Sequence, residues 1–244
     1  MKIFGFNIKN EGRFVNITCN IILGLIVGVV FMLSVFSPVI SVAYTNAEKP
    51  YYNGNKQEGN ISLMVNVYWG TEYLDDMLAS FKAENVKTTF FVGGCWVAKN
   101  NENLIKILTD GHEIANHGYN HKDHSKLTTK QNQEEIYACG ELVEALTGVK
   151  MNLFAPPSGS FNNTTLTVAS SLGYKTIMWS KDTIDWRDKD ENLIFSRATK
   201  NAENGDLILM HPTEKTAAAL PKIIKTLKEK GFNLTTVSAN IGLT

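Results

Sequence analysis

The chain has no excess of either charge and little cysteine. Its 244 residues include 24 basic and 24 acidic side chains, so the charge balance gives no argument for a nucleic-acid partner, whose phosphates attract basic surfaces. The three cysteines are Cys19, Cys95 and Cys139, and their spacing does not show whether any two of them come close enough to pair. We therefore expect no binding to nucleic acid and leave the disulfide question open.

Charge is also absent from residues 21–43, a largely apolar stretch. A helix of this length can cross a bilayer with some tilt, whereas a core helix of this length usually carries a polar face. Lys2, Lys9 and Arg13 come before it, and such charges tend to stay in the cytoplasm. We expect a cytoplasmic N-terminus (1–20), a transmembrane anchor (21–43) and an extracytoplasmic remainder. Cleavage after Ala43, which would secrete the domain, is the alternative.

Residues 44–60 are rich in Asn, Gly, Lys and Glu without apolar periodicity, which predicts a linker. A domain should then occupy residues 61–244. Apolar runs predict strands at 61–67, 88–92, 112–116, 152–155, 175–179, 206–210 and 233–237. Helical patterns around 72–84, 104–108, 128–146, 164–172, 193–202 and 217–230 separate them. This alternation is typical of an α/β fold with parallel strands, and in a barrel the carboxyl ends of the strands meet at one mouth.

Two histidines stand at the end of the third predicted strand, where residues 111–121 read G-H-E-I-A-N-H-G-Y-N-H. If the chain turns helically after His117, the rings of His117 and His121 share one face and can converge on one metal ion. A catalytic zinc normally takes three protein ligands, so a third must come from elsewhere in the chain.

Unusual side chains follow other predicted strands at the same mouth. They occur in Y-W-G at 68–70, P-P-S-G at 156–159, D-T-I-D-W at 182–186 and M-H-P at 210–212. Aromatic rings, carboxylates and a third histidine are thus expected to surround the histidine pair.

These segments resemble motifs of the polysaccharide deacetylase family, carbohydrate esterase family four, over about residues 61–237. N-H-G-Y-N-H at 116–121 is similar to the motif that supplies the two histidine metal ligands, and residues 85–92 are similar to a framework strand. Three more similarities lie at 156–162, 182–186 and 208–211. The resemblance implies a distorted (β/α) barrel of about seven parallel strands. It also implies hydrolysis of acetyl groups, at an amide C–N bond that is not a peptide bond, on a cell-wall or chitin-like polysaccharide.

The same resemblance implies roles for single residues. A divalent metal, expected to be zinc and held by His117 and His121, would polarise the acyl carbonyl and acidify a bound water. His211 matches the general acid, and Asp185 is placed to orient it and to stabilise its charge.

The first family motif, however, is altered. The family has two adjacent aspartates, a base and a third metal ligand, where this chain has Tyr68 and Trp69. Neither a phenol nor an indole takes over those tasks near neutral pH. Ala155 replaces the arginine that pairs with the base, so the two losses fit each other. Ser158 replaces a tyrosine whose backbone N–H helps to bind the oxyanion. The expected substrate-binding residues are Tyr68, Trp69, Pro157, Ser158, Trp186 and Leu209.

Three functions remain open. In the first, the domain is a working deacetylase in which another carboxylate, with Glu72 as the leading candidate, supplies the base or a metal contact. Asp123 and His124 are further candidates for the third ligand. Alternatively, the domain is catalytically inactive and binds envelope glycan on its aromatic side chains. In the third function, slow hydrolysis acts on another acyl substrate or uses a two-histidine site. A catalyst needs a carboxylate within reach of metal-bound water, whereas a binder needs only aromatic and polar groups.

Overall fold

The computed structural model describes residues 21–25 and 48–243. Residues 21–25 are helical, while the predicted cytoplasmic segment 1–20 and the rest of the predicted anchor, with the cleavage position after Ala43, lie outside the described residues. Among the residues described, no helix combines the length and apolarity needed to cross a membrane.

Strands and helices alternate along residues 48–243. The strands are β1 (Asn60–Val67), β2 (Thr89–Val92), β3 (Glu113–Asn116), β4 (Leu153–Phe154), β5 (Lys175–Thr176), β6 (Lys181–Asp182), β7 (Leu207–Met210) and β8 (Asn233–Leu234). The α-helices are α2 (Leu74–Ala83), α3 (Gly94–Val97), α4 (Asn101–Thr109), α5 (Thr129–Thr147), α6 (Asn163–Ser171), α7 (Glu191–Thr199), α8 (Glu214–Glu229) and α9 (Val237–Asn240). Two short 3₁₀ helices are η1 (His124–Lys126) and η2 (Pro157–Gly159).

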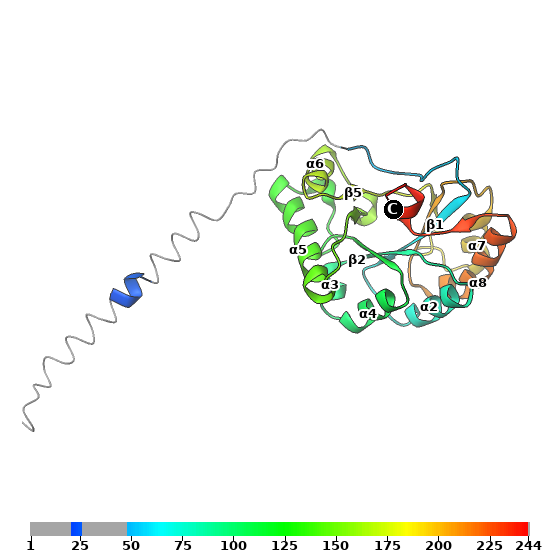
Figure 1. The fold of residues 1–244 in the computed structure, drawn as a ribbon, viewed down its shortest axis with the longest axis horizontal. Helices are drawn as coiled ribbons and strands as arrows, with labels where there is room; N and C mark the ends of the chain where they lie inside the picture. Colours follow the sequence, from blue (N-terminus) through cyan, green and yellow to red (C-terminus); the bar gives the residue numbers. More distant parts are fainter. Residues whose placement is uncertain (1–20, 26–47, 244) are drawn as a thin grey trace, which may run out of the picture. The chain divides into compact units, whose positions relative to one another are not determined.

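The sheet is parallel and curved. Its order is β5-β4-β3-β2-β1-β7-β6, with β8 added to the start of β1, and each pair of neighbours is parallel. Figure 1 shows α5, α3, α4, α2, α8 and α7 following one another around the outside of the strands. These seven strands form a half-barrel, which confirms the predicted α/β class and is consistent with a distorted (β/α) barrel.

The predicted linker packs against the domain over its described part. Tyr51 pairs with Ile177, just after β5, and Asn53 pairs with Asp206, just before β7. The Glu48 carboxylate also forms an ion pair with Lys175. Residues 48–60 therefore run along the domain from the region of β5 to that of β7. Their backbone N–H and C=O groups pair with the neighbouring backbone, and this pairing does not depend on the identity of the side chains.

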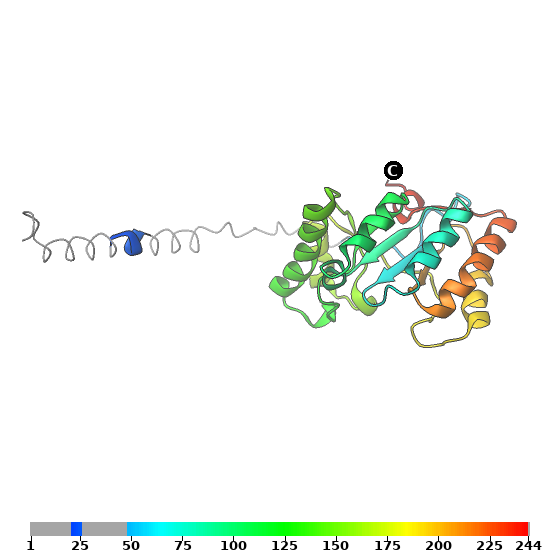
Figure 2. The same cartoon turned by 90° about the horizontal axis from the view of Figure 1, so that it is seen from below.

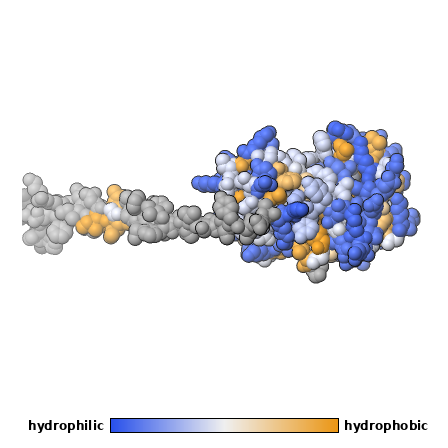
Figure 3. All heavy atoms as spheres, turned by 90° about the horizontal axis from the view of Figure 1, so that it is seen from above, coloured by the Kyte–Doolittle hydropathy of each residue, from blue (hydrophilic) through white to orange (hydrophobic). Residues whose placement is uncertain are grey.

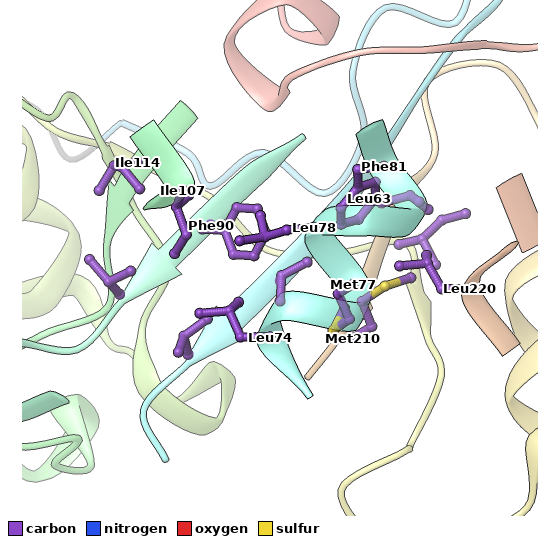
Figure 4. Close-up of a cluster of buried hydrophobic side chains, with 14 of the residues drawn as sticks. Leu63, Leu74, Met77, Leu78, Phe81, Phe90, Ile107, Ile114, Met210 and Leu220 are labelled. Carbon is purple, nitrogen blue, oxygen red and sulfur yellow. The ribbon is translucent and has the colours of Figure 1, made fainter. Parts of the chain in front are cut away.

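The core lies between the strands and the helices of the outer layer. Strand β1 is buried along nearly its whole length, and Leu74, Met77, Leu78 and Phe81 of α2 pack onto it (Figure 4). Figure 2 shows the helices lying side by side over the strands, and the face in Figure 3 is mainly hydrophilic with small hydrophobic patches. Packing therefore holds the strands rigidly and fixes where they end.

Some predicted boundaries were wrong. The fifth strand is shorter than 175–179, and residues 181–182 form a separate strand, β6, that pairs with β7. The last predicted strand ends at Leu234, after which Thr236 caps α9 by accepting a hydrogen bond from the Ala239 N–H. Both differences arise because a strand of two residues is defined by the strand it pairs with. The local sequence pattern does not determine it.

Candidate functional site

A cavity of about 330 Å³ opens at the carboxyl ends of the strands. It is lined by Asn66, Trp69, His117, His121, Ser158, Trp179, Asp182, Trp186, Leu209 and His211. A second groove of about 490 Å³ shares Trp69 and Trp186 with it. These two exposed tryptophans separate the deep cavity from the outer groove.

The histidine pair meets in a loop. The chain does not turn helically after His117, because Gly118 and His121 have φ values of +72° and +54°, outside the right-handed helical region. The two rings nevertheless come together, with centroids 5.1 Å apart.

Hydrogen bonds to Glu135 of α5 hold this loop, and the sequence analysis did not identify this residue. Its carboxylate accepts hydrogen bonds from the backbone N–H groups of Tyr119 (3.1 Å) and Asn120 (2.7 Å) and from the Asn120 side-chain amide (2.8 Å). It also forms an ion pair with Lys122 at 2.9 Å. Although burial raises the pKa of Glu135, the hydrogen bonds from Asn120 and the interaction with Lys122 outweigh it and hold the pKa below its usual value.

Both histidines have a pKa below the ordinary value of the side chain. Burial, reinforced by His121, lowers the pKa of His117 to about 3, and burial also lowers the pKa of His121. His117 Nδ1 lies 2.8 Å from the carbonyl oxygen of Ala155. Because a carbonyl only accepts, Nδ1 carries the hydrogen and Nε2 remains an acceptor.

Aromatic rings cover two of the three cavity imidazoles. The Tyr68 ring stacks on His121 with centroids 4.3 Å apart, and the Trp69 ring stacks on His211 at 5.3 Å. The residues that replace the two aspartates of the resemblance therefore lie directly against the histidines.

Asp185 is hydrogen-bonded to His211. Its Oδ1 lies 2.8 Å from His211 Nδ1, and its Oδ2 accepts hydrogen bonds from the His211 backbone N–H (2.6 Å) and the Thr216 hydroxyl (2.5 Å). Asp185 is 2% exposed. The pair retains the geometry of an oriented general acid, whether or not it is used in a reaction.

The turn that carries Asp185 and Trp186 is strained. Ile184 has a φ of +54°, which is costly for a β-branched residue. The Asp182 Oδ1 accepts a hydrogen bond from the Ile184 N–H at 2.7 Å, and Arg197 donates to the Thr183 carbonyl at 3.0 Å. These bonds hold the turn in place, and Asp182 lines the cavity beside it.

The three candidates for a further carboxylate or ligand do not line this cavity. Glu72 is exposed and lies in the outer groove, where it accepts a hydrogen bond from the Thr71 N–H at 2.9 Å. Asp123 binds Ser125 and pairs with Lys126. His124 is buried against Asn132, with 2.7 Å between Nδ1 and Oδ1.

The predicted substrate-binding residues divide into two sets. Trp69, Ser158, Trp186 and Leu209 line the cavity, whereas Tyr68 reaches it through its contact with His121, and Pro157 is buried. Asn66 and Trp179 also line the cavity but were not predicted. The sequence around these two side chains gave no functional signal. Asn66 lies near the carboxyl end of β1, and Trp179 follows β5.

The described residues do not fit the divalent metal that the resemblance implies. A catalytic zinc needs three protein ligands, but no group of three or more His, Cys, Asp or Glu side chains in the described part of the chain is arranged to hold a metal ion. Tyr68 and Trp69 supply π-faces instead of the missing carboxylates.

Comparisons with known proteins establish the family. Residues 53–177 match the profile of polysaccharide deacetylases. The uncharacterized protein YlxY of Bacillus subtilis is 43% identical over 190 residues, which cover 78% of this chain and 60% of that protein. The peptidoglycan-N-acetylmuramic acid deacetylase PdaA of the same species is 33% identical over 193 residues, covering 77% of this chain and 73% of PdaA. The chain belongs to the polysaccharide deacetylase family, which confirms the predicted hydrolase class at family level.

The solved structures add a second kind of relative. BA3943 of Bacillus anthracis, described as a CE4 family pseudoenzyme, is 34% identical with a TM-score of 0.77, and the match covers 79% of this chain and 69% of that one. A BA3943 mutant described as having restored enzymatic activity matches with 33% identity and the same TM-score. Active and inactive proteins therefore share this fold.

Proposed function

We propose that the domain binds a cell-wall or chitin-like glycan in the histidine cavity without hydrolysing its acetyl groups. The observation that carries this proposal is the stacking of Tyr68 on His121 and of Trp69 on His211. These rings stand where a hydrolase of this family would need a base and a third metal ligand. Aromatic faces are well suited to the apolar faces of sugar rings.

The exposure of the tryptophans supports binding at the cavity entrance. Trp69 is 44% exposed and Trp186 is 53% exposed, although large aromatic side chains are usually better buried. Because both also line the outer groove, a chain of several sugars could extend from one space into the other.

Metal-dependent deacetylation is the second candidate, and the preserved His211–Asp185 pair favours it. In that case Glu72 would have to reach the metal, but it lies in the outer groove and accepts the Thr71 N–H. The geometry therefore supports binding better than turnover.

The test combines calorimetry with an acetate-release assay on the full chain. We expect no micromolar affinity for zinc or cobalt, no acetate from N-acetylated chitin oligomers or peptidoglycan, and measurable affinity for at least one glycan. Micromolar zinc binding that disappears in His117→Ala, together with acetate release, would instead establish the hydrolase. As a positive control, Tyr68→Asp with Trp69→Asp should restore a metal site.

We also propose that the glycan-binding domain faces the outside of the membrane, as the apolar segment 21–43 predicts. Accessibility of Cys95 to a membrane-impermeant thiol reagent in intact cells, compared with lysed cells, tests this location.

A further inference from the structure

The cavity wall presents two side chains that can accept hydrogen bonds, His117 and Asp182. His117 Nε2 is an acceptor because Nδ1–H donates to Ala155. Asp182 adds a carboxylate whose Oδ1 is engaged by the Ile184 N–H.

The charge of the lining is negative. Among the described residues that line the cavity there is no lysine or arginine, and Asp182 is the one carboxylate. Arg187, in the same turn, is ion-paired with Asp188 at 2.8 Å and lies 5.8 Å from the centre of the Trp186 ring. A bound ligand displaces water from an acceptor, which then needs a donor in return, so the preferred ligand should bring donors and a positive charge.

We propose that the cavity recognises a free amino sugar, of the glucosamine type found in N-deacetylated glycans, in preference to its N-acetylated form. The ammonium group has N–H donors and a positive charge, and His117 Nε2 and the Asp182 carboxylate are two acceptors of one cavity. An N-acetyl nitrogen carries one donor and no charge, so it leaves at least one acceptor unmatched.

The aromatic lining supports the same ligand. Trp69, Trp179 and Trp186 line the cavity, and a cation near an indole face is stabilised by cation–π attraction. A lining without cations disfavours sugars with a carboxylate at this position, because no positive group would pair with it. The inference rests on the proposed glycan binding and specifies the chemical class that is bound.

The experiment compares two probes by calorimetry on the full chain: a fully deacetylated chitin tetramer, in buffer acidic enough to protonate its amines, and the N-acetylated tetramer. Because a hydrogen bond to a charged group is strong, we expect about tenfold or greater preference for the amine form. Added salt should weaken the binding of that form.

Asp182→Asn is the decisive variant, because its amide oxygen can still accept the Ile184 N–H and keep the turn. It should abolish the preference, and a circular dichroism spectrum and urea unfolding curve that match those of wild type would show that the variant is folded. Glu144→Gln, at an exposed position of α5, is the matched control and should keep the preference.

Three outcomes overturn the inference, and they differ in what they leave standing. If both tetramers bind equally, or the N-acetylated one binds better, the amino-sugar preference is refuted while glycan binding stands. If neither tetramer nor peptidoglycan binds, the proposed function falls as well. A preference that survives in Asp182→Asn would also refute the assigned role of this carboxylate.

Discussion

Replacing Glu135 with glutamine tests whether one buried carboxylate determines the shape of the histidine loop. The side chain is nearly isosteric, so packing is kept and only charge and hydrogen bonding change. With its amide oxygen facing the backbone N–H groups of Tyr119 and Asn120, its NH₂ group must face the Asn120 amide and Lys122, where it is the wrong partner.

The cost follows from these contacts. Hydrogen bonds to a charged group contribute about 1.5–3 kcal/mol each, and a buried donor left without a partner costs about 1–3 kcal/mol. The Lys122 side chain is half exposed, so its ion pair adds little. We expect Glu135→Gln to lower the free energy of unfolding by about 2–4 kcal/mol.

Urea unfolding monitored by circular dichroism measures this loss, and Glu134→Gln is the matched control. Glu134 is the adjacent residue, 62% exposed and 3.8 Å from Lys130, so its substitution should cost no more than about 0.5 kcal/mol. Hydrogen exchange should show faster exchange at residues 119–122 in the Glu135 variant. Equal stability of the two variants would refute the assigned role of Glu135.

The pH dependence provides a second check on the same carboxylate. Because the folded-state pKa of Glu135 is held below its ordinary value of 4.5, its contribution is fully present above that pH and is lost as pH falls through the lowered pKa. The stability difference between wild type and Glu135→Gln should therefore shrink below pH 4.5. A difference that stays constant into strong acid would contradict this explanation.

Three further substitutions test the framework of the domain, each by urea unfolding. Phe90→Ala should cost about 3–5 kcal/mol because the ring is fully buried, and a loss below about 1 kcal/mol would mean that the core refills the space. Gly94→Ala would bring a Cβ within 2.2 Å of Tyr119 Cδ2 and should cost about 1–3 kcal/mol, with unchanged stability showing that the ring moves freely. Asn162→Ala removes the cap that accepts the Thr165 N–H and should cost about 1 kcal/mol, whereas no loss would show that another group caps α6.

The sequence predicts a feature well when neighbouring residues determine it. Helix α5 spans Thr129–Thr147, close to the predicted 128–146. The Thr128 capping box starts it and Gly148 in the left-handed conformation ends it, and both signals act within one helical turn. The conformation after His117 could not be predicted from the sequence, because it depends on Glu135, which binds the loop from another element. A glutamate in a charged helix gives no sign that it will be buried.

Features that depend on pairing between distant segments escape sequence analysis. Strand β6 has two residues and exists because it pairs with β7, and two residues show no periodicity. The stretch 48–60 has the composition of a linker, yet its backbone pairs beside Ile177 and Asp206. Likewise, the sequence shows that Trp69 replaces a carboxylate, but the contact of its ring with His211 depends on the three-dimensional fold.

The retained histidines have partners that require no metal. His211 bonds to Asp185 and stacks against Trp69, and His121 stacks against Tyr68, in contacts of the kind worth about 0.5–1.5 kcal/mol each. Two carboxylates beside these imidazoles would need a cation to offset their charge, whereas aromatic rings need none. Among the described residues, Asp182 is the one carboxylate of the cavity lining. The proposed preference for an ammonium group therefore rests on this single negative charge, because the aromatic replacements carry none.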